Sequence, residues 1–440
     1  MRRILLCLSI TLVLAVPGVA QDPPAGTQPD VTITLADGNA RQLRLAVPDA
    51  GLDNTASASL RVAAGDFDQT LRDDLDFAGP FRVQGPDELG VLTLTGNQGH
   101  DFEQYRSLGN DIVVLGRIFE EGDRFVLEGY VYDLPSGQSV FGKRYRGSMD
   151  QARRIAHTFA DAIVEALTGE PGIALSALAF HSDRDGFQEL YLMDYDGRNQ
   201  RRITGHKSTS GFPNWSGTSD AIAYVSYFTE QPGVYYVKLP GGEKVPIHTS
   251  GNLNISPSIS SDGQWVAFGH ADAVNTDIFV CQREACSAPQ QITKASGIDT
   301  NPAWSPDGSQ IAFTSDRSGR PNVYVMERDG SNVRRISFDG NYNDGAAWHP
   351  EGTLIAYASR RGNRFQITVT DAVTLETRTL TSGPHSYEEP TWSPNGRYLA
   401  FSEKRGRSSQ IWVIDSDGGA PRQLTFEGNN AAPDWSAGAL

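Results

Sequence analysis

The sequence predicts an all-β six-bladed β-propeller that follows a small α/β domain. Two independent markers repeat with one period, and each occurs six times. The first is a Pro-x-Trp element whose copies lie 43 to 45 residues apart, with Ile259 in the one place that lacks tryptophan. The second is an Ile-Ala-Phe-like element at intervals of 44 or 45 residues. A period of this length, filled by short strands, is typical of propeller blades. The marker residues are Trp215, Trp304, Trp348, Trp392 and Trp435, and Phe180, Tyr224, Phe268, Phe313, Tyr357 and Phe401.

The N-terminal residues are typical of an export signal. Two arginines precede an apolar run from Ile4 to Val16, and small residues follow it. This run is shorter than the roughly 20 residues that cross a bilayer, so we interpret residues 1–20 as a signal peptide. Residues 21–30 are rich in proline and are expected to form an extended tail. The mature protein should then be exported without a transmembrane span.

Charge and cysteine content narrow the class of protein. The formal net charge is −15 at pH 7, which disfavours nucleic acid and anionic lipid as partners and favours a basic protein. Cys281 and Cys286 lie on either side of a short predicted turn. An oxidising compartment allows them to form a disulfide, and two free thiols are the alternative.

Residues 31–169 carry no repeat and predict the α/β domain. We expect strands at 31–38 and 41–50, a helix at 55–79, a β-meander at 111–147 and a helix at 149–169. The last helix should end at Gly169, a residue favoured in C-caps. His157 and Asp161 are four residues apart on it, and we interpret them as a pair on the helix surface. The apolar face of this helix consists of Ile155, Phe159, Ile163 and Leu167.

Residues 173–440 form the predicted propeller, and we interpret the repeated motif as structure rather than chemistry. In one copy, Ser305–Gly308 predicts a type I turn, and Trp304 supplies apolar area between neighbouring blades. The first marker along the chain is Phe180 and the last is Trp435. We therefore expect the C-terminal strand to pair with the first blade and close the ring.

Catalytic motifs are missing from the sequence. It contains no Gly-x-Ser-x-Gly nucleophile elbow, no His-Glu-x-x-His zinc helix and no phosphate-binding Gly-Lys-Ser loop. We therefore expect a protein that is not an enzyme, with no catalytic residues, no cofactor and no metal site.

One group of polar residues remains as a candidate binding site. In each repeat a polar residue lies five positions before the tryptophan, where the chain should approach the mouth of the central channel. The alternative is that these side chains only complete turns, and a bound cation such as Ca²⁺ is a further, less favoured possibility. The residues are Ser210, Asn254, Asp299, Asn343, Tyr387 and Asn430, with Thr300, Asp344, Glu388 and Glu389 beside them.

The run "PAWSPDGSQIAFTSDRSGRPNVYVM" resembles the propeller of the TolB family, which belongs to the Tol–Pal system of Gram-negative bacteria. The segments "LRDDLDFAGPFRV", "YRSLGNDIVVLGRI" and "EGYVYDLPSGQSVFGKRYRG" resemble the family's N-terminal domain in order and spacing. The resemblance covers nearly all of the mature chain. Other propellers share the first run, so the N-terminal domain makes the resemblance specific.

The resemblance implies a periplasmic, non-enzymatic hub that maintains the outer membrane and helps it constrict at division. It implies that the propeller mouth binds the lipoprotein Pal, and Thr300 matches the family's Asn-Thr-Glu-Pro-x-Trp loop. Leu253 stands where the family has a histidine. It also implies that the mature N-terminus binds TolA, through Gln21, Asp22, Asp30, Val31, Thr32, Ile33, Thr34 and Leu35. Other outer-membrane or peptidoglycan-linked proteins are possible further partners.

Two other classes of function stay open from the sequence. One is a propeller enzyme, such as a metal-dependent hydrolase or lactonase, and the other is a binder of peptidoglycan or carbohydrate. Bound metal in the purified protein would favour the first, and binding to peptidoglycan without Pal would favour the second.

Overall fold

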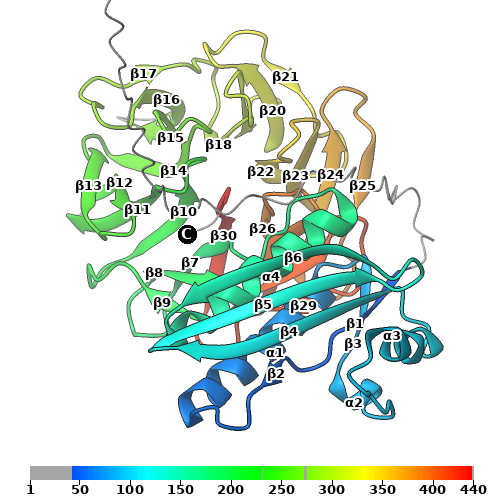
Figure 1. The fold of residues 1–440 in the computed structure, drawn as a ribbon. Coiled ribbons are helices and arrows are strands. Elements are labelled where there is room, and N and C mark those ends of the chain that lie inside the picture. Colours follow the sequence, from blue (N-terminus) through cyan, green and yellow to red (C-terminus); the bar gives the residue numbers. More distant parts are fainter. Residues whose placement is uncertain (1–41, 230, 272–274, 439–440) are drawn as a thin grey trace, which may run out of the picture.

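The computed structural model describes residues 42–229, 231–271 and 275–438. A small α/β domain lies against one side of a ring of six sheets (Figure 1). The signal peptide, the proline-rich tail, the strand expected at 31–38 and the residues assigned to TolA all lie outside the described residues.

The small domain has a mixed sheet with helices on it. The strand order is β3-β1-β4-β5-β6, with β2 paired to β4; β1 is parallel to both of its neighbours, and β4, β5 and β6 form the expected antiparallel meander. A 3-10 helix, η1 (Met149–Gln151), precedes α4. The other elements are β1 Leu43–Ala46, β2 Gly51–Leu52, α1 Ala58–Phe77, β3 Phe81–Gln84, α2 Pro86–Leu89, α3 Gln98–Ser107, β4 Ile112–Glu121, β5 Arg124–Asp133, β6 Gln138–Gly147 and α4 Ala152–Thr168.

The helices α1 and α4 form where the sequence predicts them. The Ser57 side chain caps α1 by accepting the Leu60 N–H at 3.1 Å. In α4 the four expected apolar residues are buried, and Gly169 ends the helix at φ +78°. Both helices pack on one face of the sheet in a common core. Helices α2 and α3 were not predicted, because their sequence has little apolar periodicity.

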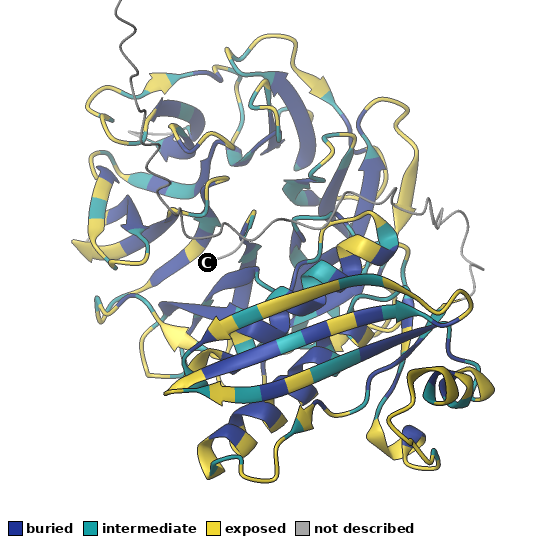
Figure 2. Cartoon of the chain, viewed as in Figure 1, coloured by how far each residue is buried: buried dark blue, intermediate teal, exposed yellow. Residues whose placement is uncertain are grey.

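The propeller has six four-stranded sheets, as predicted (Figure 1). Figure 2 shows the inner strands largely buried and the rim loops exposed. Blade 1 is β30 Asn430–Trp435, β7 Ala177–Ser182, β8 Glu189–Asp194 and β9 Arg201–Arg202; blade 2 is β10 Ser210–Trp215, β11 Ala221–Thr229, β12 Gln231–Lys238 and β13 Lys244–His248; blade 3 is β14 Leu253–Ile259, β15 Trp265–Ala271, β16 Asp277–Gln282 and β17 Gln290–Gln291. Blade 4 is β18 Asp299–Trp304, β19 Gln310–Ser315, β20 Asn322–Glu327 and β21 Arg334–Arg335; blade 5 is β22 Asn343–Trp348, β23 Leu354–Arg361, β24 Arg364–Asp371 and β25 Thr377–Thr379; blade 6 is β26 Ser386–Trp392, β27 Tyr398–Arg405, β28 Ser408–Asp415 and β29 Arg422–Gln423.

The C-terminal strand closes the ring, as predicted. β30 pairs antiparallel with β7, with Trp435 opposite Leu178 and Asn430 opposite Ser182. The Trp435 Nε1–H donates to Ser176 Oγ at 2.8 Å. The inner strand of blade 1 therefore comes from the opposite end of the propeller sequence, which leaves no open seam in the ring.

The repeated tryptophan joins neighbouring blades in two ways. Trp304 packs with Ile278 of blade 3 and Phe313 of its own blade, which confirms its predicted place between blades. Its Nε1–H also donates to the Ser258 carbonyl of blade 3 at 3.1 Å. Trp348 and Trp392 make the same bond to the preceding blade, also at 3.1 Å. The predicted turn is present as well, because the Gly308 N–H donates to the Ser305 carbonyl at 2.9 Å.

Candidate functional site

The mouth of the channel is hollowed by a cavity of about 520 Å³. In every blade, a β-bulge interrupts the pairing between the inner strand and the next strand. The residue three positions before the tryptophan position lies at this bulge and has a left-handed backbone. Proline follows this residue in five of the six blades, and proline has no N–H to continue the ladder. We call the six residues the mouth ring; they all line the cavity and are Phe212, Ser256, Asn301, Gly345, Glu389 and Ala432.

The position predicted to line the mouth is buried behind it, which corrects the sequence interpretation. Ser210, Asn254, Asp299, Asn343 and Asn430 have no exposed surface, and Tyr387 is 6% exposed. Asn254 Nδ2 donates to the carbonyl of Ser250 at 2.9 Å, and Asn343 Nδ2 donates to that of Asp339 at 2.9 Å. In these two blades, and in blade 1 through Asn430 and the Glu427 carbonyl, the side chain ties the inner strand to the loop before it. The turn alternative therefore holds for this position.

Three of the other four predicted residues, Asp344, Glu388 and Glu389, line the cavity and are partly exposed. Asp344 Oδ1 accepts from Asn301 Nδ2 at 2.6 Å and from Thr314 Oγ1 at 2.7 Å. Glu389 Oε2 accepts the Ala432 N–H of blade 1 at 2.8 Å. Two of the acids thus hold neighbouring inner strands together. Thr300 precedes Asn301 at the bulge of blade 4.

The mouth is less acidic than the sequence suggests, because Lys404 lies among its carboxylates. Its Nζ is 2.7 Å from Glu388 Oε2 and 4.0 Å from Glu389 Oε1. Burial by itself would lower the pKa of Lys404, but the two glutamates outweigh it and raise the pKa. Arg360 also lines the cavity. The mouth is therefore a mixed-charge surface.

The mouth ring could have been found in the sequence. The residue before the Pro-x-Trp proline is the same position in every repeat, but its identity changes from Phe to Ser, Asn, Gly, Glu and Ala. Sequence reasoning favoured the more uniform polar position two residues earlier. At three of these polar positions, Asn254, Asn343 and Asn430, the side chain makes the same structural bond, whereas the variable position faces the cavity.

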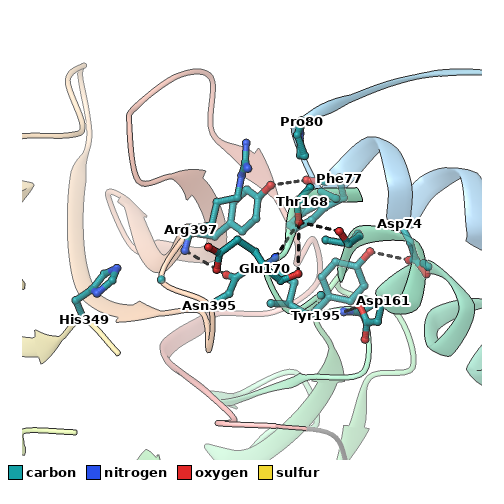
Figure 3. A pocket seen from close by; sticks show the side chains of 18 of the residues that line it. Asp74, Phe77, Pro80, Asp161, Thr168, Glu170, Tyr195, His349, Asn395 and Arg397 are labelled. Atoms are coloured by element: carbon teal, nitrogen blue, oxygen red, sulfur yellow. Dashed lines mark hydrogen bonds between the residues drawn. The ribbon is translucent and has the colours of Figure 1, made fainter. Parts of the chain in front are cut away.

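A second hollow, of about 280 Å³, lies between the two domains. Figure 3 shows α1 and α4 on one side of it and the propeller strands on the other. The Tyr398 hydroxyl of blade 6 donates to the Phe77 carbonyl at 2.6 Å, and Arg153 of α4 lies 2.6 Å from Asp196 and 3.3 Å from Asp194 of blade 1. These bonds join the domains around the hollow.

Asp74, from α1, is at the centre of this domain contact. It is 3% exposed and accepts from His157 Nδ1 at 2.7 Å and from the Tyr195 hydroxyl at 2.6 Å. The interpretation of His157 and Asp161 as a surface pair was wrong. His157 is buried against Asp74, and Asp161 accepts the N–H groups of Ala174 and Leu175. Both side chains lie on the face of α4 that is turned away from the sheet, where they meet the propeller and the interdomain segment.

Burial changes the acidity of these carboxyl groups. It raises the pKa of Asp74, and it raises the pKa of Asp161 to about 6 despite the two backbone donors. Burial against the same contact raises the pKa of the Tyr195 hydroxyl well above its ordinary value. Burial in the domain contact therefore shifts the titration of both carboxyl groups toward higher pH.

Three further observations concern chemistry and the membrane. Cys281 and Cys286 form a disulfide, as expected. Among the described residues, no group of three or more His, Cys, Asp or Glu side chains could hold a metal ion. In the same part of the chain, no helix combines the length and apolar character needed to cross a membrane.

Comparison with known proteins gives one consistent result. A family model described as the TolB beta propeller domain matches residues 164–439, and one described as the TolB amino-terminal domain matches residues 31–140. The Tol-Pal system protein TolB of Bordetella parapertussis is 28% identical over 73% of this chain and 70% of its own length. A TolB homolog of Chlorobium chlorochromatii is 30% identical over 56% of each chain.

The match to the Chlorobium relatives spans about 56% to 60% of their length. Among solved structures, TolB from Acinetobacter baumannii superposes with a TM-score of 0.77 at 25% identity, over 90% of this chain and 97% of that one. The propeller model alone covers more than half of the present sequence. By fold, by both domains and by sequence, the chain belongs to the TolB family.

Proposed function

We propose that this chain is a non-catalytic periplasmic hub of the Tol–Pal system, active in outer-membrane integrity and in constriction during division. In this proposal the propeller mouth binds Pal, and the mature N-terminus, after removal of residues 1–20, binds TolA. Membership of the TolB family carries the proposal, since relatives bear the name Tol-Pal system protein. The hollow, loop-rimmed mouth on a rigid ring supports it, because such surfaces commonly carry recognition.

The Pal half is tested at Glu388, which lies at the mouth beside Lys404. Glu388→Lys would place two cations together and reverse the local charge. We expect the dissociation constant for purified Pal to rise at least about tenfold, measured by calorimetry, with an unchanged unfolding temperature. Asp417→Lys is the matched control, since Asp417 is 91% exposed in a turn at the far end of blade 6. Equal affinities for the Glu388 variant and the wild type would remove this residue from the proposal.

The TolA half is tested by deleting residues 21–35 from the mature chain. We expect pull-downs with TolA to fail while pull-downs with Pal succeed. Retained TolA binding would place the TolA site elsewhere.

The same purified protein distinguishes the other classes of function. Stoichiometric metal that survives dialysis would favour a metal-dependent enzyme. Retention on purified peptidoglycan sacculi without Pal would favour a carbohydrate binder. Neither is expected if the chain acts through protein partners.

A further inference from the structure

Phe212 differs from the rest of the mouth ring. Its backbone has φ +54°, a conformation that bulky residues rarely adopt. The equivalent residues of the other blades are Ser, Asn, Gly, Glu and Ala. The Phe212 side chain is nevertheless 45% exposed over the cavity. A large apolar ring is thus held at a strained position, where a smaller or more polar residue would suit both the backbone and the solvent.

The Phe212 ring is only partly packed into the fold. Its one aromatic contact among the described residues is an edge contact with His181, with ring centroids 5.9 Å apart. A strained backbone that carries a bulky, partly exposed side chain is a common mark of a functional position. We therefore expect the Phe212 side chain to contact a binding partner.

Three more exposed aromatic side chains lie at the same end of blades 1 and 2. Phe187 is 52% exposed in the loop after β7, and Tyr227 and Phe228 are 42% and 45% exposed at the end of β11. Strand pairing places these segments at the mouth, since Ser182 is opposite Asn430 and Ser226 is opposite Ser210. We call these three residues and Phe212 the aromatic rim.

Charged side chains line the mouth over the blades that follow around the ring, since blade 6 adjoins blade 1. Asp344 and Arg360 belong to blade 5, and Glu388 and Lys404 belong to blade 6. The mouth face thus has an aromatic part over blades 1 and 2, where Asp183, Arg184 and Asp185 share the loop of Phe187, and a charged part over blades 5 and 6. Exposed apolar patches with a polar border mark contact surfaces for proteins.

We propose that the aromatic rim is the apolar part of the docking surface for the protein that binds the mouth, and that Phe212 is its anchor. The occupant is a folded protein that presents an apolar patch next to a charged one, so that only one orientation across the mouth matches both parts. Phe212 lines the cavity as well as the rim, so one partner covers the two together. This inference rests on the proposed function and names the residue that would decide affinity.

The test uses the full mature chain, Pal without its lipid anchor, and two measurements for each variant. Phe212→Gly and Phe212→Ser should weaken Pal binding at least about tenfold in calorimetry, as loss of an anchoring aromatic does. Phe212→Gly should also keep or raise the unfolding temperature, because glycine adopts a positive φ without strain. Leu375→Gly repeats the backbone change outside the mouth, at a residue with φ +64° that is 40% exposed. Val373→Asn removes an apolar side chain that is 82% exposed in the same turn at the far end of blade 5. Both controls should bind like the wild type.

The outcomes separate this inference from the function on which it rests. If the wild type does not bind Pal, the proposed function fails. If the wild type binds and both Phe212 variants bind equally well, the anchor is refuted and the proposed function stands. A lower unfolding temperature in both variants would indicate a structural role and would also refute it. So would a wild-type dimer that Phe212→Gly converts to a monomer, since the rim would then contact a second copy.

Discussion

Single side chains form hydrogen bonds across the seams, which are the junctions between neighbouring blades. The Ile259 N–H donates to Asn214 Oδ1 of the preceding blade at 2.7 Å, and the Trp215 N–H donates to Asp434 Oδ2 at 2.6 Å. The Trp435 N–H donates in the same way to Thr391 Oγ1 at 3.3 Å. A buried backbone N–H without an acceptor is energetically costly. In these blades, the residue before the tryptophan supplies a side-chain acceptor for the backbone N–H at the equivalent position of the next blade. Asp434 supplies it for the seam that follows the closing strand.

The first prediction concerns the pH dependence of that seam. Burial raises the pKa of Asp434 from 3.8 to about 7. Between these pH values the folded protein holds a proton that the unfolded chain has released, so stability falls as pH rises from about 4 to about 7. Asp434→Asn should remove up to about 4 kcal/mol of that fall, measured by denaturant unfolding from pH 4 to pH 8.

Part of the pH dependence should survive in this variant. Burial also raises the pKa of Asp68 to about 7 and that of Asp161 to about 6, which gives the same sign. Identical pH profiles for Asp434→Asn and the wild type would show that the carboxyl is ionised in the ring.

At the scale of elements, α1, α4 and blade 1 meet through Asp74. The carboxylate takes one donor from α4 and one from the propeller. An unsatisfied buried acceptor costs more than a hydrogen bond contributes, so this contact is sensitive to the loss of either donor.

The second prediction is that Tyr195→Phe destabilises the domain contact by about 1–3 kcal/mol, since one oxygen of Asp74 loses its donor. Unfolding followed by tyrosine and tryptophan fluorescence measures the loss. Tyr130→Phe is the control, because Tyr130 is 40% exposed on the sheet of the small domain. An equal effect of the two substitutions would argue against a specific role for the Tyr195 hydroxyl.

The third prediction concerns the hairpin that follows β16. The disulfide closes a short loop that contains Arg283, whose guanidinium contacts Asp220 of blade 2 at 3.0 and 3.1 Å. Replacing both cysteines by serine should lower the free energy of unfolding by about 2 kcal/mol on the loop-entropy estimate. Addition of a reductant should lower the wild type to the same value and leave the variant unchanged. A reductant effect on the variant would point to another cause.

At the scale of the whole molecule, closure makes the ring one unit. Strands from the two ends of the propeller sequence share blade 1, so opening that blade separates the ends of the ring. A substitution that weakens another junction between blades leaves β30 paired with β7, so the two ends of the propeller sequence stay joined.

The fourth prediction compares two buried tryptophans. Trp435 is 5% exposed and Trp348 is 9% exposed, and alanine at either position should cost about 3–5 kcal/mol. Only Trp435→Ala should also expose the C-terminal strand to limited proteolysis under native conditions. Equal protection of that strand in the two variants would contradict the special role of the closing seam.

The sequence was most informative where one physical requirement recurs. Five tryptophans with Ile259 in the sixth place, and six aromatic markers, predicted the blade count and the closing strand, because every blade must bury the same apolar positions. The disulfide followed from two cysteines across a turn. The recurring polar position before each tryptophan was misplaced, because Asn343 and Asn430 recur for a structural bond that resembles a functional pattern.

By itself the sequence determined the repeat, the order of the domains and the pairing of its ends, since these follow from local periodicity and burial. Only the tertiary structure decided which side chains face the cavity, because the bulge at each inner strand redirects neighbouring residues in a way that alternation does not predict. It also brought His157 and Asp74, 83 residues apart, into contact. This contact depends on how α1 and α4 pack against each other, which a local sequence pattern does not encode.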